Sequence, residues 1–208
     1  YIYIEDGVVS PQIIGENIVV MPVQAVVTTE AALREALTAG GEITLGADIT
    51  ATSAFVVGGN TVLDGNGHTI TSTADRAINV SGAENATIKN LTIEASGERA
   101  INIIQNSKNV TIDNVTATAA NYTVNVAASA PNAVVAISNS TLNGLCTVNV
   151  AAEAANVSVD NSTVNCNDNN TTVGESYAAL CLNKEAINGS IVATNSTINV
   201  TAESDSYK

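Results

Sequence analysis

The chain has few of the side chains that usually line ligand pockets, with no Trp and a single Phe in 208 residues. Pockets for small molecules depend heavily on aromatic side chains. The hydrophobic residues make up 45% of the chain and are mostly Ala, Val, Ile and Leu. This composition favours a narrow interior filled layer upon layer and argues against a ligand cavity.

Basic residues are scarce, with seven Lys and Arg against twenty Asp and Glu and a net charge of −13. Nucleic acids and anionic lipid surfaces both require a Lys/Arg footprint, which this chain lacks. The sequence also contains no run of eighteen apolar residues. We therefore expect no nucleic-acid partner and no membrane insertion.

The three cysteines, Cys146, Cys166 and Cys181, show no metal-ligand spacing such as C-x-x-C. They are interpreted as buried, unreactive thiols, with a local Cys146–Cys166 disulfide as the alternative. We expect neither a metal ion nor a cofactor.

A short phrase recurs about every two dozen residues and alternates apolar with polar side chains. Its copies occupy residues 86–92, 110–116, 135–141 and 157–163, and a last copy ends at 194–197. A second phrase follows the same period at residues 76–80, 99–103, 122–126 and 146–150. Self-similarity at a fixed period, combined with period-two alternation, indicates a solenoid built of strands.

The coil length indicates which solenoid is formed. Coils that repeat in one direction place neighbouring strands parallel, about 4.8 Å apart. A coil of about 24 residues accommodates three strands and three turns, whereas left-handed hexapeptide helices use shorter coils. The sequence predicts an all-β, right-handed parallel β-helix of six or seven coils with three strands per coil. Its inward columns should be Ile88, Ile112, Ile137 and Val159, and Ile78, Ile101, Val124 and Val148.

The N-terminal part is expected to close one end of this helix. Residues 1–27 are interpreted as leading strands that pack on the solenoid, with a linker from an upstream domain as the alternative. Within the β-helix domain, residues 28–208, a capping helix is predicted at 29–39. Thr29 is its N-cap, Glu30 and Arg34 can pair at i,i+4, and Gly40-Gly41 ends it.

The C-terminal residues 200–208 contain no comparable helix pattern. An uncovered last coil would present unpaired strand edges that promote association. We expect that further coils, the tail or a second copy cover this end, the last case being end-to-end self-association.

Asparagines recur at fixed places in the repeat. One column, Asn90, Asn114, Asn139, Asn161 and Asn195, lies just before an inward position and is predicted to form a stacked ladder that shapes a turn. A second column, Asn79, Asn102, Asn125 and Asn149, is expected to face solvent. A third column consists of Thr92, Thr116, Thr141, Thr163 and Thr197 and should also face outward.

Several of these segments resemble pectate-lyase-like β-helix domains of bacterial surface proteins. The resemblance rests on the Thr29–Gly41 helix, the segments 42–49 and 63–70, and the Asn ladder, and it covers about residues 28–200. It implies the β-helix fold, within a superfamily that includes lyases, glycoside hydrolases and adhesins.

The residues needed for catalysis in that superfamily are not found in a matching arrangement. A calcium-dependent lyase would need clustered acids where this chain has the neutral Asn79, Asn102, Asn125 and Asn149. The Gly-His-Gly turn of polygalacturonases corresponds here to Gly67-His68-Thr69, without the second Gly. We predict no catalytic residues and a non-enzymatic protein, with a polysaccharide-active lyase or hydrolase fragment as the alternative.

One coil is longer than the others, and the excess lies between Asn167 and Tyr177. Insertions in solenoids emerge as loops, where binding is often located. Tyr122, Asp168, Glu175 and Tyr177 are therefore the candidate ligand-binding residues, with a tolerated surface insertion as the alternative. The sequence favours an extracellular or cell-surface stalk or adhesin whose partner is a polysaccharide or host-surface glycan, with a purely structural spacer as another alternative.

Overall fold

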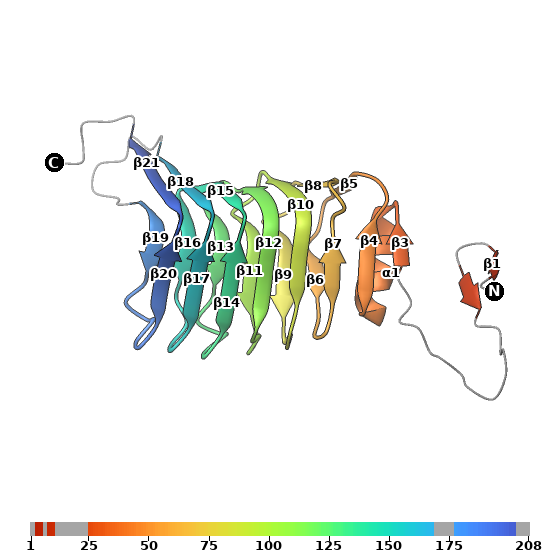
Figure 1. Ribbon diagram of the computed structural model, residues 1–208, viewed down its shortest axis with the longest axis horizontal. Helices are drawn as coiled ribbons and strands as arrows, with labels where there is room; N and C mark the ends of the chain where they lie inside the picture. The colour runs from red at the N-terminus through yellow and green to blue at the C-terminus, as the bar shows by residue number, and fades with distance from the viewer. Residues whose placement is uncertain (1–2, 6–7, 11–24, 169–176, 203–208) are drawn as a thin grey trace.

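The chain forms a β-solenoid, in which the strands of successive coils stack side by side along a rod (Figure 1). The computed structural model describes residues 3–5, 8–10, 25–168 and 177–202. Across its described coils the strand pairs are parallel, as the repeat predicts. The solenoid makes about five turns, slightly fewer than the six or seven expected.

The strands of the rod form three faces. The first face contains β3 (Ala25–Val27), β4 (Glu42–Leu45), β7 (Val62–Asp64), the first halves of β10 (Thr87–Ala95) and β12 (Val110–Thr118), β14 (Val134–Ser138), β17 (Asn156–Asp160) and β20 (Ser190–Thr194). The second face contains β5 (Ile49–Ala51), β8 (Thr69–Ser72), the second halves of β10 and β12, β15 (Thr141–Gly144), β18 (Thr163–Asp168) and β21 (Thr197–Ala202). The third face contains β6 (Phe55–Val57), β9 (Arg76–Ser81), β11 (Arg99–Ile104), β13 (Tyr122–Val126), β16 (Cys146–Val150) and β19 (Ala178–Leu182).

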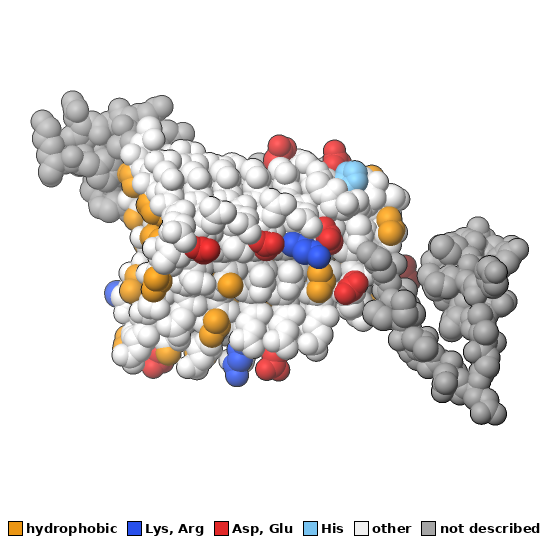
Figure 2. All heavy atoms as spheres, in the orientation of Figure 1, with side chains coloured by type: hydrophobic (Ala, Val, Ile, Leu, Met, Phe, Trp, Pro, Cys, Tyr) orange, Lys and Arg blue, Asp and Glu red, His pale blue; other side chains and the backbone are white. Residues whose placement is uncertain are grey.

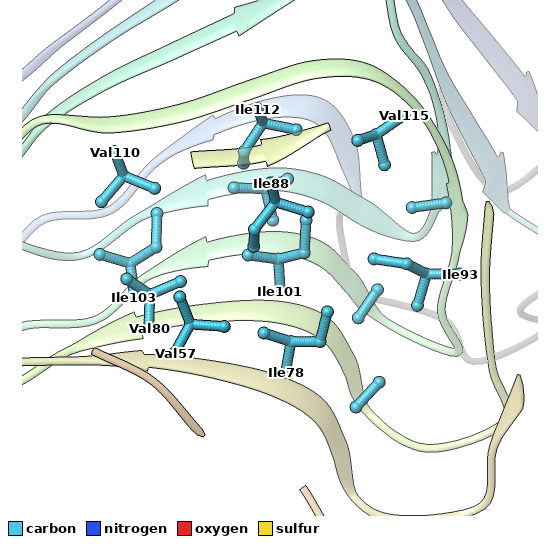
Figure 3. Close-up of a cluster of buried hydrophobic side chains, with 14 of the residues drawn as sticks. Val57, Ile78, Val80, Ile88, Ile93, Ile101, Ile103, Val110, Ile112 and Val115 are labelled. Carbon is cyan, nitrogen blue, oxygen red and sulfur yellow. The ribbon is translucent and has the colours of Figure 1, made fainter. Parts of the chain in front are cut away.

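The interior is built from columns of branched side chains, and both predicted inward columns are confirmed. Ile88, Ile112, Ile137 and Val159 lie in register on the first face and are almost fully buried. Ile78, Ile101, Val124 and Val148 do the same on the third face. Figure 3 shows members of the two columns approaching each other across the interior. Side chains from facing strands thus fill the rod and form one continuous core.

Two polar residues enter this interior and use their hydroxyls to bond the backbone of a neighbouring coil. Ser140 accepts a hydrogen bond from the Val115 N–H at 3.1 Å, and Ser162 accepts one from the Ser140 N–H at 3.0 Å. Buried N–H groups need hydrogen-bond partners. A serine at each of these positions supplies an acceptor for such a group, which an apolar side chain could not do.

The predicted capping helix is present as α1 (Glu30–Ala39). Thr29 Oγ1 accepts a hydrogen bond from the Ala32 N–H, and Gly40 ends the helix with a positive φ of 74°. Leu33 and Leu37 are buried against the first coil, so α1 covers the apolar end of the solenoid.

Arg34 fastens α1 to the first coil. Its guanidinium donates to the carbonyl oxygens of Ser53 at 2.7 Å and Ala54 at 2.9 Å, and it lies 4.6 Å from the centre of the Phe55 ring. The predicted ion pair with Glu30 also forms, at 2.7 Å. The cap is therefore attached by polar bonds as well as by its apolar face.

The N-terminal strands divide into two groups. β1 (Tyr3–Glu5) and β2 (Val8–Ser10) pair with each other in antiparallel fashion, whereas β3 pairs in parallel with β4 of the solenoid. The packing of residues 1–10 on the solenoid, and the division at residue 28, stay predictions.

The long coil leaves the stacking intact. Val157 pairs with Ile191, 34 positions later, whereas Ile88 and Ile112 on the same face are 24 positions apart. The strands that follow the additional residues therefore keep the register of the strands before them. Residues 169–176 lie outside the described part of the chain.

Candidate functional site

The first predicted asparagine ladder occupies the corner between the first and second faces. Asn90, Asn114, Asn139, Asn161 and Asn195 all have positive φ values between 46° and 53°. Asparagine tolerates this left-handed conformation better than other residues with a side chain, because its short carboxamide bonds locally. The predicted turn-shaping role is confirmed.

The ladder at this corner is not continuous, because at two places an asparagine donates to an aspartate of the preceding coil and not to the asparagine beside it. Asn114 Nδ2 donates to Asn90 Oδ1 at 2.9 Å, and Asn161 Nδ2 donates to Asn139 Oδ1 at 2.8 Å. The other three asparagines donate to the aspartate one position earlier in the preceding coil: Asn90 to Asp64, Asn139 to Asp113 and Asn195 to Asp160.

These aspartates are occupied by hydrogen bonds. The Ser138 hydroxyl and the Asn139 carboxamide lower the pKa of Asp113, and the Thr194 hydroxyl and the Asn195 carboxamide lower that of Asp160. A general acid of a glycoside hydrolase needs the opposite, a raised pKa that keeps its proton at neutral pH. These carboxylates therefore support the turn and are unsuited to acid catalysis.

A second asparagine ladder runs without interruption along the outside of the third face. Each carboxamide donates from Nδ2 to the Oδ1 of the preceding rung, at 2.8 Å from Asn102 to Asn79, 2.8 Å from Asn125 to Asn102 and 2.7 Å from Asn149 to Asn125. In the next coil Cys181 takes the in-register position, and Asn183, two residues further on, donates to Asn149 Oδ1 at 3.4 Å.

The expectation that this column faces solvent is wrong for three of its members. Asn102, Asn125 and Asn149 are only 3–5% exposed. They do point outward between the inward Ile and Val positions, but the rungs of the adjacent coils stack directly above and below each one. Alternation predicts the side of the strand correctly and does not predict the shielding by stacked neighbours.

A cationic and aromatic column lies beside this ladder. Arg76, Arg99 and Tyr122 occupy equivalent positions in three successive strands, β9, β11 and β13. The Arg99 guanidinium carbon is 5.1 Å from the centre of the Tyr122 ring, within the range of a cation–π contact. Each arginine also pairs with the acid that precedes it in the sequence, Asp75 or Glu98.

The tyrosine is held as a neutral hydrogen-bonding group. Partial burial, followed by the neighbouring Cys146, raises the pKa of Tyr122 above its usual value. The hydroxyl of a tyrosine is protonated at neutral pH even without this shift, and it can both donate and accept a hydrogen bond.

A shallow groove of about 410 Å³ follows the outside of the third face. It is lined by Arg76, Asn79, Arg99, Asn102, Ile104, Asn125 and Ala127. It combines two guanidinium groups and three carboxamides with the aliphatic side chains of Ile104 and Ala127. Tyr122 contacts Arg99, which lines the groove, and does not line the groove itself. Polar groups of fixed geometry on a rigid sheet can orient a hydroxyl-rich ligand.

The four predicted ligand-binding residues are distributed over several elements. Tyr122 begins β13, and Tyr177 is half-buried and packs against the core beside the last coil. Asp168 ends β18, where its backbone pairs with Ala202, and Glu175 lies outside the described residues. The contribution of these residues to binding stays a prediction. Arg76 and Arg99 line the groove and are not among the predicted site residues, although their positions in the repeat match that of Tyr122.

The second face carries the predicted outward threonine column in register: Thr92, Thr116, Thr141, Thr163 and Thr197. A neighbouring column becomes an asparagine ladder in the later coils, where Asn165 Nδ2 donates to Asn143 Oδ1 and Asn199 Nδ2 donates to Asn165 Oδ1, both at 2.8 Å. In Figure 2, Lys, Arg, Asp and Glu side chains occupy only a small part of the visible surface of the rod.

The residues considered for chemistry are engaged elsewhere. His68 Nδ1 lies 3.2 Å from Asp48 Oδ1 in an exposed pair next to a Gly-containing turn. In the described part of the chain, no three His, Cys, Asp or Glu side chains form a group that could hold a metal ion. Cys146, Cys166 and Cys181 are in the thiol form and not joined in a disulfide. Cys146 and Cys166 are buried as predicted, whereas the expectation of burial is wrong for Cys181, which is only partly buried. Burial raises the pKa of Cys146 to about 11.

The three faces, the interior columns and the capping helix define a parallel β-helix of the pectate-lyase-like type. Residues 24–130 match the model of a family described as "Putative pectate lyase-like adhesive domain", and the chain belongs to this family. None of the curated proteins matches the chain. Among the described residues, no helix has the length and apolar character needed to cross a bilayer.

Proposed function

We propose that the chain is a non-catalytic adhesion module of a secreted or cell-surface protein, and that it contacts glycans through the groove on its third face. The observation that carries this proposal is the alignment of Arg76, Arg99 and Tyr122 beside a continuous carboxamide ladder. The family description as an adhesive domain supports the adhesive role.

The groove suits a repeating polymer. Its binding groups recur once per coil, about 4.8 Å apart along the axis, so that successive units of an extended chain meet similar surroundings. Guanidinium groups can donate two parallel hydrogen bonds to a carboxylate or to neighbouring hydroxyls. Because Asp75 and Glu98 pair with the two arginines, the groove is locally close to neutral despite the acidic chain.

The geometry also favours binding without turnover. Glycoside hydrolysis requires two carboxyl groups flanking the scissile bond, one with a raised pKa. The ladder side chains along the groove are carboxamides, and Glu98 and Asp75 are each paired with an arginine. This arrangement supports a ligand that is held and released unchanged.

The experiment is a binding screen of the 208-residue chain against immobilised polysaccharides, including a uronic-acid polymer and a neutral polymer. We expect binding to at least one glycan, and we expect Tyr122→Ala or Arg99→Ala to weaken it roughly tenfold or more, the loss of about 1.4 kcal/mol. Thr141→Ala, which changes an outward residue of the second face, is the matched control and should bind like the wild type.

Two results would contradict the proposal. Folded wild-type chain that binds none of the glycans leaves a structural spacer as the function. Release of unsaturated or reducing sugars from the uronic-acid polymer would identify the protein as an enzyme. Circular dichroism of each variant verifies that a loss of binding is not a loss of fold.

A further inference from the structure

The last coil of the solenoid presents an apolar end surface. Its strands β19, β20 and β21 pair with the preceding coil through one edge, and no described strand pairs with the opposite edge. Leu182, Ile198 and Val200 are 40–62% exposed there and make up three of the eight large hydrophobic residues exposed in the described chain. Figure 2 shows hydrophobic side chains gathered at this end of the rod.

These three side chains are exposed because they occupy interior positions on which no described residue is stacked. Ile198 is in register with the fully buried Val164, and Val200 is in register with the fully buried Cys166. Leu182 is likewise in register with the buried Val150. The end surface therefore has the chemistry of the core, whereas α1 covers the corresponding surface at the other end.

The end surface carries little charge. Between residues 177 and 202 the only charged side chains are Lys184 and Glu185, which pair at 3.6 Å, although the whole chain has a net charge of −13. Two acidic copies can approach through this surface with less electrostatic repulsion than through any surface that bears the acidic residues.

The strand edges also offer hydrogen bonds to a partner. Asn199 donates to Asn165, and no described residue donates to its own Oδ1. The free edges of β19, β20 and β21 expose backbone N–H and C=O groups that pair readily with another chain.

The size of the surface is sufficient for a specific interface. The three strands contain 5, 5 and 6 residues, 16 in all. At about 3.3 Å per residue and a width of about 10 Å, their edges cover roughly 500 Å² per copy. Two such surfaces would bury roughly 1,000 Å² in total, the lower bound for a specific interface.

We propose that two copies of the chain associate through their C-terminal coils, end to end, about a two-fold axis perpendicular to the rod. The strands that meet at the junction then run antiparallel, a pairing at least as stable as the parallel one within each copy. Because α1 covers the other end of each copy, assembly stops at two chains and forms no filament. This inference is independent of the glycan groove, which lies on the side of the rod.

The test is light scattering coupled to size-exclusion chromatography, supported by sedimentation equilibrium, on the 208-residue chain at about 10–200 μM. The monomer mass is 21.1 kDa, so we expect the mass to approach about 42 kDa as concentration rises. Ile198→Lys and Val200→Lys each place an unpaired charge in the junction and should weaken the dimer roughly a hundredfold. Val134→Lys, which changes an exposed valine on β14 at the side of the rod, is the matched control.

Three outcomes would overturn the proposal. The first is a wild-type mass that stays at the monomer value over the whole concentration range, which would mean that something other than a second copy suits this surface. The second is growth beyond two chains. The third is a dimer that is weakened by Val134→Lys as much as by the junction variants. A dimer that neither junction variant weakens would count against the proposal in the same way. Using two junction variants keeps the test decisive if one of them does not fold.

Discussion

The continuous ladder on the third face makes a quantitative prediction at its central rung. Asn125 donates to Asn102 and accepts from Asn149, and all three carboxamides are at least 95% buried. Its φ is not among the positive values, so Asn125→Ala changes the side chain without a backbone penalty. The variant therefore isolates the contribution of the ladder.

The expected loss follows from the two hydrogen bonds that disappear. Each contributes about 1 kcal/mol net, and the Asn102 Oδ1 and Asn149 Nδ2 left without a rung each cost about 1 kcal/mol or more when buried. We expect Asn125→Ala to lower the free energy of unfolding by about 3–4 kcal/mol. For a chain of this size the midpoint of thermal unfolding should fall by about 6–12 °C.

The matched control is Asn79→Ala at the first rung, which is part-exposed and makes one ladder bond. It should cost only about 1 kcal/mol. Guanidinium unfolding followed by circular dichroism, together with thermal scans, gives both values. Equal losses in the two variants would show that burial of the stacked rungs adds nothing, and the reasoning would fail.

Two further predictions concern the cap and the corner aspartates. Arg34→Ala removes the hydrogen bonds to the Ser53 and Ala54 carbonyls, and we expect it to lower the free energy of unfolding by about 1–2 kcal/mol. Amide hydrogen exchange in Glu30–Ala39 should become faster, and unchanged exchange would contradict the role of Arg34 in attaching the helix. Hydrogen bonds from Ser138 and Asn139 depress the pKa of Asp113 in the folded chain below its unfolded value of about 3.9. Their stabilising effect is complete above that value and is lost as the pH falls through the folded pKa, so the thermal midpoint should fall below about pH 4. Asp113→Asn should make that fall smaller, and an identical pH profile in the variant would exclude Asp113 as a contributor.

The glycan screen and the measurement of dimer mass address different surfaces. Tyr122 and Arg99 lie on the side of the rod, whereas Ile198 and Val200 belong to the end surface of its C-terminal coil. A variant of one surface should therefore leave the other property unchanged. Each proposal can fail without affecting the other.

The sequence by itself determined the architecture, because a fixed period and period-two alternation are local properties of the chain. The period placed Ile88 over Ile112 and Ile78 over Ile101, as the structure confirms. The cap at Thr29 was equally readable, since N-cap chemistry depends on residues within one helical turn.

Only the tertiary structure decided which asparagines form an unbroken ladder. Asn90 and Asn102 are equally regular in the sequence, yet Asp113 and Asp160 interrupt the first column while the second is unbroken from Asn79 to Asn149. The choice depends on which acceptor of the preceding coil lies within 3 Å of each carboxamide. That distance is set by how the coils stack and is not encoded in the spacing of the repeat.

The environment of the candidate site was also decided in three dimensions. The sequence aligned Arg99 with Tyr122, but the contact between guanidinium and ring depends on side-chain rotamers in adjacent coils. The shielding of Asn125 likewise comes from residues more than twenty positions away in the chain. Period and alternation determine where each side chain starts and which way it points, whereas its partners and its exposure depend on the coils stacked above and below it.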